Sequence, residues 1–129
     1  MLIVEDQDQM RRMLREYLQS AYAGAVILEA ANGARTLELC RSQRPRLVLM
    51  DINLPDANGI DLTAQIMEML PETAVIVVSQ HAAQVYVERA RAAGAFAYIN
   101  KDTVYRELLP AVGRALGGRS SPPAEGDPQ

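Results

Sequence analysis

Tryptophan is absent from this sequence, and cysteine and histidine each occur once. The lone Cys40 excludes an internal disulfide, and no group of cysteines and histidines has the spacing of a zinc site. No apolar run approaches the ~20 residues that a membrane-spanning helix needs, and the first residues lack the basic and apolar parts of a secretion signal. We therefore expect a soluble protein of the reducing cytoplasm, with no membrane contact.

The sequence also lacks a strong excess of charge of either sign. The net charge is -3, and the 13 positive residues are scattered along the chain, so we expect no direct binding of nucleic acid. With 129 residues, of which 49% are apolar, the chain is long enough for one compact core. Because only 5% of the residues are aromatic, that core must consist of aliphatic side chains and methionine.

Short apolar runs alternate with longer segments in which apolar residues recur at helical spacing. Strands that alternate with helices build parallel sheets covered on both faces, so we expect an α/β fold with a doubly wound, five-stranded parallel sheet. Since the runs are apolar on both faces, we expect the strands to be buried. The runs cover residues 2–4, 25–30, 47–50, 74–78 and 96–100.

Five helices are expected between and after these runs. Proline cannot continue a helix, so the third should stop at Pro71, and Gly94 can cap the fourth in a left-handed conformation. Pro110 falls inside the fifth helix, where a kink is the alternative to a continuous helix. The predicted helices cover residues 8–22, 33–44, 59–70, 82–93 and 103–116.

The last residues have almost nothing to bury. From Gly117 onward, glycine, serine and proline dominate, which is typical of disordered segments. We therefore predict a folded domain over residues 1–117. Residues 118–129 are predicted to be a disordered tail or the start of a linker to another domain.

Polar residues directly follow four of the apolar runs. Glu5 and Asp6 follow the first, Asp51 the third, Ser79 the fourth and Lys101 the fifth. In parallel sheets, ligands bind outside the carboxyl ends of the strands. We expect three carboxylates, one hydroxyl and one ammonium group to meet on that rim.

This set of groups suits phosphoryl transfer. The three carboxylates would raise one another's pKa unless a cation lay among them, and carboxylates with a backbone carbonyl are ligands that Mg²⁺ accepts. A carboxylate oxygen of Asp51 could then attack a phosphoryl donor and form an acyl phosphate. Lys101 would pair with the transferred group, and the Ser79 hydroxyl would hydrogen-bond one of its oxygens.

Four segments of the sequence stand out together. They are Ile-Val-Glu5-Asp6, Leu-Val-Leu-Met-Asp51 through Pro55 to Gly59, Val-Ile-Val-Val-Ser79, and Ala-Gly-Ala-Phe-Ala-Tyr98-Ile-Asn-Lys101. In this order and spacing, they resemble the receiver domains of two-component response regulators, in the CheY-like superfamily, and the resemblance covers nearly all of residues 2–116. The resemblance implies a flavodoxin-like sheet with strand order 2-1-3-4-5.

The resemblance also implies a metal site and a phosphorylated residue. Asp51 matches the aspartate that is phosphorylated, and Asp6 matches the acid that binds Mg²⁺ directly. Glu5 matches a neighbouring acid that assists through water. Asn53 matches the position whose backbone carbonyl ligates the metal.

The remaining matches concern the switch. Ser79 matches the switch hydroxyl, Lys101 the lysine that contacts the phosphate, and Tyr98 the aromatic residue whose rotation reports phosphorylation. Two positions depart from the family pattern: Gln80 stands where a small residue is usual, and Asp102 stands where many members have proline. Gln80 bears on phosphate lifetime. Asp102 bears on the geometry of the loop, because the usual proline and its cis bond are absent.

The family's partners follow as expectations. The resemblance implies a signalling switch rather than an enzyme, phosphorylated by a sensor histidine kinase or a phosphotransfer protein. A homodimer is open, through more than one face. The Lys101-Asp102 pair is familiar from regulators that carry a C-terminal helix-turn-helix, so an output domain in a longer protein is a further expectation.

Simpler interpretations stand beside these. Glu5 and Asp6 could merely cap the next helix, the segment from Asp51 to Gly59 could be only a turn, and Ser79 could be a helix cap. His81, two residues after Ser79, is interpreted as a solvent-facing loop residue, with modulation of phosphate lifetime as the alternative. Two rival functions are a phosphohydrolase with an aspartyl nucleophile and a degenerate receiver used only for protein binding. Asn53 weakens the first, because an amide cannot protonate a leaving group.

Overall fold

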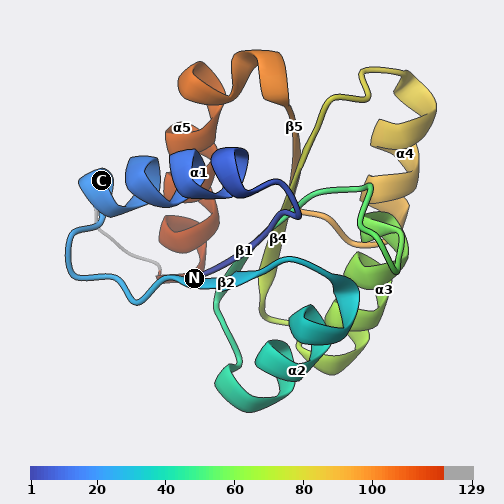
Figure 1. The fold of residues 1–129 in the computed structure, drawn as a ribbon, viewed down its shortest axis with the longest axis horizontal. Coiled ribbons are helices and arrows are strands. Elements are labelled where there is room, and N and C mark those ends of the chain that lie inside the picture. Colours follow the sequence, from blue (N-terminus) through green and yellow to red (C-terminus); the bar gives the residue numbers. More distant parts are fainter. Residues whose placement is uncertain (121–129) are drawn as a thin grey trace.

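Five parallel strands form the centre of the fold, in the order β2-β1-β3-β4-β5, as predicted (Figure 1). The computed structural model describes residues 1–120, with side-chain burial up to residue 117. The strands are β1 (Leu2–Val4), β2 (Leu28–Ala30), β3 (Leu47–Met50), β4 (Ala74–Ser79) and β5 (Ala97–Asn100). The helices are α1 (Asp8–Ala21), α2 (Gly33–Gln43), α3 (Gly59–Met69), α4 (Gln84–Ala92) and α5 (Val104–Ser120), with a 3₁₀ turn, η1 (Lys101–Thr103), before the last.

The helices cover both faces of the sheet. Figure 1 shows α1 and α5 together on one face, and α2, α3 and α4 on the other. Side chains alternate between the faces along a strand, so Ile3 packs in the α1–α5 layer while Leu2 and Val4 pack in the α2–α3 layer. The doubly wound architecture is therefore confirmed. No helix in the described part of the chain has both the length and the apolar character that crossing a membrane requires.

The prediction of five buried strands is correct only for the centre of the sheet. Every residue of β1, β3 and β4 is buried, but Leu28 and Glu29 of β2 and most of β5 are only half-buried. β2 is also shorter than predicted, and Phe96, before β5, is 48% exposed. β2 and β5 are the edge strands of the sheet, so each has a neighbouring strand on one side only.

The helix boundaries differ from the prediction mainly in the second half of the chain. The fourth helix begins at Gln84, two residues later than expected, while Gly94 has the predicted positive φ of 104°. The turn η1 was not predicted. The last helix contains Pro110 and extends to Ser120, so residues 118–120 of the predicted tail are helical. Residues 121–129 lie outside the described residues, and the tail proposed there stays a prediction.

The start of α3 is pressed against the segment that carries Asp51. The Asn58 side chain caps this helix by accepting from the backbone N–H groups of Ile60 and Asp61. The N–H of Gly59 donates to the Ile52 oxygen at 2.7 Å. A Cβ at position 59 would overlap the backbone oxygen of Asp51 and lie 2.8 Å from its carbonyl carbon. Only glycine leaves room for this approach.

We predict that Gly59→Ala lowers the free energy of unfolding by about 3 kcal/mol, because the added methyl group must displace backbone rather than a flexible side chain. Gly113→Ala is the matched control, since a Cβ there meets no atom within 4 Å. It should stabilise α5 by about 0.5–1 kcal/mol. Urea unfolding followed by circular dichroism measures both, and equal values for the two variants would contradict the close approach.

Candidate functional site

The predicted polar residues meet at the carboxyl edge of the sheet. Strand register explains this: Val4 pairs with Met50, Met50 with Val77, and Ser79 with Asn100. The residues that follow these strands therefore emerge side by side. They border a cavity lined by Asp6, Gln7, Asp51, Asn53, Ser79, Gln80 and Lys101.

Three carboxylates converge beside this cavity. Glu5, Asp6 and Asp51 can each place one carboxylate oxygen within 4.8 Å of the other two. Their exposure differs: Glu5 is 1% exposed, Asp51 is 8% exposed, and Asp6 faces solvent. Hard oxygen ligands at this separation fit a small divalent cation.

Lys101 neutralises part of this negative charge. Its Nζ lies 2.9 Å from Glu5 Oε1 and 3.5 Å from Asp51 Oδ1. Burial alone would lower the pKa of this ammonium group, but the hydrogen bond that it donates to Glu5 and the negative charge of Asp51 raise the pKa overall. Lys101 is the only lysine in the chain, and its ammonium group is a compact point charge on a flexible stem, unlike the planar fork of an arginine.

Glu5 is the most deeply buried of the acids. Burial raises its pKa, the hydrogen bond with Lys101 opposes that rise, and the negative charge of Asp51 adds to it. The second carboxylate oxygen accepts from the backbone N–H of Gln7 at 3.1 Å. Gln7 precedes α1, and its N–H is not one of the N–H groups of the first helical turn, so Glu5 does not cap the helix.

Asp51 is oriented through one side of its carboxylate. Its N–H donates to the Val4 oxygen at 3.0 Å, which extends the pairing of β1 with β3. Oδ1 accepts from the Ile52 N–H at 2.9 Å and faces Lys101. Within residues 1–120, Oδ2 accepts no hydrogen bond. This oxygen is therefore available to a ligand.

Ser79 and Tyr98 are joined through His81, which sequence reasoning placed in solvent. The His81 N–H donates to Ser79 Oγ at 3.0 Å, and the Tyr98 hydroxyl donates to the His81 oxygen at 2.6 Å. Ser79 does not cap α4, which begins only at Gln84. Both residues of the predicted switch thus bind the same short backbone segment.

The His81 ring itself is engaged as well. Its Nε2 lies 2.9 Å from Asn53 Nδ2, and the ring stacks on Tyr86 with 4.4 Å between centroids. His81 is half-buried and its contact with Asn53 lies at the exposed surface, so the solvent-facing interpretation is correct only in part. No pattern along the chain revealed this contact, because it joins two loops that only the pairing of β3 with β4 brings together.

The loop with the unusual Asp102 has a regular geometry. The Asn100 side chain accepts from the Asp102 N–H at 2.8 Å and caps η1. No cis peptide bond occurs between residues 1 and 120. A capped 3₁₀ turn therefore follows Lys101 directly. Gln80 lines the cavity and is exposed.

Comparisons with known proteins agree on one family. The family model of the response regulator receiver domain matches residues 1–113. The transcriptional activator protein ExaE of Pseudomonas putida is 31% identical over 119 residues, which are 92% of this chain and 56% of that protein. This chain spans about half the length of the curated relatives it matches.

Solved structures give the same result. A two-component response regulator of the LuxR family from Aurantimonas sp. SI85-9A1 superposes with a TM-score of 0.85 at 28% identity, covering 91% of this chain and 84% of that one. A CheY-like response regulator receiver domain protein from Methanospirillum hungatei JF-1 has a TM-score of 0.82 at 29% identity, covering 89% and 90%.

The raised pKa of Glu5 predicts a pH dependence of stability in metal-free protein. Between the ordinary pKa of a glutamate and the raised value, the folded state binds more protons than the unfolded state, so stability falls as the pH rises. Glu5→Gln removes the titrating carboxyl group and with it this pH dependence. Urea unfolding of both proteins in a chelator, from about pH 4 upward, should show wild type losing stability relative to Glu5→Gln. If the stability of wild type relative to Glu5→Gln stayed constant or rose with pH, the raised pKa of Glu5 would be contradicted.

Proposed function

We propose that this chain, which belongs to the response regulator receiver domain family, accepts a phosphoryl group on Asp51 and changes an interaction surface in response. The observation that carries the proposal is the geometry of the Asp51 carboxylate. Oδ1 is held by the Ile52 N–H beside Lys101, while Oδ2 has no partner among the described residues. Two further acids stand beside it.

The proposed reaction uses this free oxygen as the nucleophile. A carboxylate oxygen of Asp51 attacks the phosphorus of a phosphohistidine in line, so that a P–O bond forms while the P–N bond breaks and the imidazole leaves. Lys101 pairs with the developing negative charge on the phosphoryl oxygens, and Ser79 Oγ donates a hydrogen bond to one of them. Both groups already lie at the cavity.

The same residues fit Mg²⁺ as a cofactor. Glu5, Asp6, Asp51 and the backbone carbonyl of Asn53 would hold the ion, since this donor set is all oxygen and carries a surplus of negative charge. When bound, Mg²⁺ supplies positive charge that offsets the repulsion among the acids and between Asp51 and the phosphoryl donor. Glu5 is buried and already hydrogen-bonded to Lys101 and Gln7, so it would assist the more exposed Asp6 and Asp51 in holding the ion.

The proposed switch runs through His81. A Ser79 hydroxyl that turns toward the phosphoryl group gives up the hydrogen bond from the His81 N–H, and Tyr98 is tied to the oxygen of the same residue. Phosphorylation would then shift a pre-existing equilibrium between two arrangements of this loop and of the surface around α4 and β5. Such a change is a switch of the chain's own state, not turnover of a separate substrate.

The partners proposed here follow from this chemistry. A sensor histidine kinase or a phosphotransfer protein supplies the phosphoryl group, and a second copy of the chain is a candidate partner of the switched face. Because the chain spans about half of relatives named as transcriptional regulators, we propose a DNA-binding output domain, such as a helix-turn-helix, in the whole protein. We also propose that it acts in the cytoplasm, where histidine kinases present their phosphohistidine.

A phosphohydrolase is the weaker alternative. An enzyme of that kind needs an acid near the nucleophile to protonate the leaving group. Position 53 carries an amide, and its side-chain nitrogen lies 2.9 Å from the His81 ring. A degenerate receiver used only for protein binding is also disfavoured, because the acids, the hydroxyl and the ammonium group all reach the same cavity.

We predict that a small phosphoramidate and Mg²⁺ add one phosphoryl group to wild type, and that Asp51→Asn abolishes this gain. Intact-mass measurement is the readout. Asp61→Asn is the matched control, since Asp61 is an exposed aspartate in the first turn of α3, and it should gain the same mass as wild type. No gain in wild type, or an equal gain in Asp51→Asn, would contradict the assignment.

A further inference from the structure

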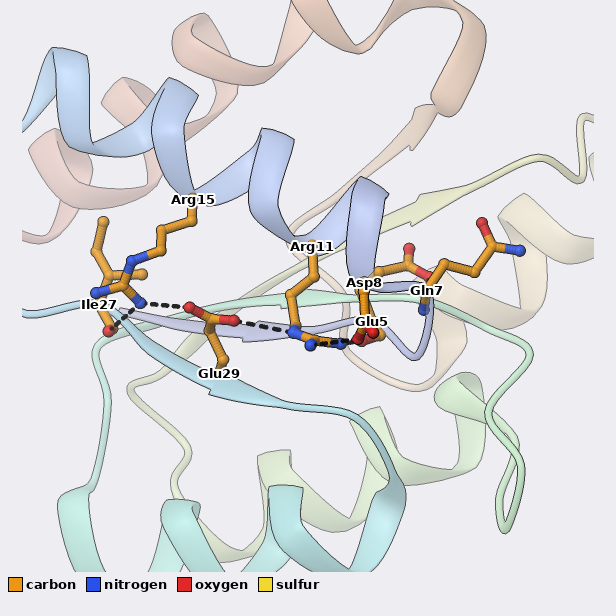
Figure 2. A network of polar contacts seen from close by, with 7 residues as sticks. All are labelled: Glu5, Gln7, Asp8, Arg11, Arg15, Ile27 and Glu29. Carbon is orange, nitrogen blue, oxygen red and sulfur yellow. Dashed lines mark hydrogen bonds and ion pairs between the residues drawn. The ribbon is translucent and has the colours of Figure 1, made fainter.

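An arginine network joins α1 to the edge strand beside the site (Figure 2). The guanidinium group of Arg11 uses all three of its nitrogens. Nε donates to Glu29 Oε1 at 2.9 Å, Nη1 to the backbone oxygen of Glu5 at 2.9 Å, and Nη2 to Asp8 Oδ1 at 2.6 Å. Only 18% of the Arg11 side chain is exposed. A planar fork held at three points has little freedom to move.

The bond to Glu5 falls where sheet pairing ends. The Val4 oxygen still accepts from the Asp51 N–H, and the Glu5 N–H still donates to the Ala30 oxygen. The Glu5 oxygen lies beyond β1, and its bonded partner is Arg11. A peptide unit is planar, so the direction of this carbonyl also fixes the start of the next residue, Asp6.

Asp6 depends on its backbone for its position. Glu5 has side-chain bonds with Lys101 and Gln7, whereas the exposed Asp6 carboxylate accepts no hydrogen bond from any group in residues 1–120. The direction in which Asp6 points toward Asp51 is therefore set by the turn after β1. Whatever orients the Glu5–Asp6 peptide orients this carboxylate.

From these contacts we infer that Arg11 is a positioning residue of the metal site, acting through the Glu5 carbonyl on the Asp6 carboxylate. The inference rests on the proposed function, because it concerns the same Mg²⁺ site. Asp8 and Glu29 hold the guanidinium group in place from two sides. Arg11 thereby ties the acids of the site to both α1 and β2.

Arg15 provides an internal comparison. It lies one turn further along α1 and pairs with the same carboxylate, since its Nη1 donates to Glu29 Oε2 at 2.6 Å and to the Ile27 oxygen at 3.0 Å. Figure 2 shows Arg15 reaching toward Ile27, at the opposite end of the network from Glu5. Replacing Arg15 removes an ion pair with Glu29 but leaves the turn after β1 untouched.

The test compares Arg11→Gln with Arg15→Gln. Binding of Mn²⁺, followed by electron paramagnetic resonance, and of Mg²⁺, followed by calorimetry, should weaken about tenfold in Arg11→Gln, as for other groups that orient metal ligands. Arg15→Gln should bind both ions as wild type does. In phosphorylation by a phosphoramidate, the Mg²⁺ concentration for half-maximal rate should rise by the same factor in Arg11→Gln, with little change in the rate at saturating Mg²⁺.

Equal metal affinity in wild type and Arg11→Gln, or an equal loss in Arg15→Gln, would overturn the inference. Arg11→Lys serves if Arg11→Gln does not fold. It keeps the charge but not the three-point fork, so its affinity should be weaker than that of wild type, and unchanged affinity would overturn the inference as well. A wild-type protein that neither binds Mg²⁺ nor gains a phosphoryl group would instead contradict the proposed function itself.

Discussion

The ion pair between Lys101 and Glu5 is the interaction on which the site depends. A carboxylate that is 1% exposed is costly to ionise, and an ammonium group 2.9 Å away offsets much of that cost. Removing one partner of such a buried pair typically costs about 3–5 kcal/mol. Three carboxylates lie beside this one ammonium group, so a surplus of negative charge remains. The surplus is what a divalent cation would neutralise.

The fold makes this crowding possible by fixing the backbone on every side. Parallel pairing sets the ends of β1, β3 and β4 next to one another, and Gly59 lets α3 press on the segment after Asp51. Asp56 continues this bracing, since its carboxylate accepts from the N–H groups of Gly33 and Ala34 at the start of α2. Arg11 does the same for the turn after β1. The acids are therefore held mainly by the backbone and not by one another.

Much of this architecture could be predicted from the sequence, and the failures have physical causes. The central strands and the polar residues at their carboxyl ends follow from local patterns, because a short apolar run followed by an acid can be recognised without knowledge of distant neighbours. The exposure of β2, the length of α5 and the contact of His81 with Asn53 depend on neighbours distant in the chain. The contact of Arg11 with the site was also not predicted, because its partner at Glu5 is a backbone oxygen. Every residue has such an oxygen, so no pattern of side chains reveals the contact.

If a cation completes the acid cluster, Mg²⁺ should stabilise the folded state, and the most direct measurement is the free energy of unfolding against Mg²⁺ concentration at constant ionic strength. A ligand that binds only the folded state adds RT ln(1 + [Mg²⁺]/Kd). We predict that rise in wild type and its loss in Asp6→Ala, because the Asp6 carboxylate is part of the cluster. A stability that does not respond to Mg²⁺, or an equal rise in both proteins, would contradict it.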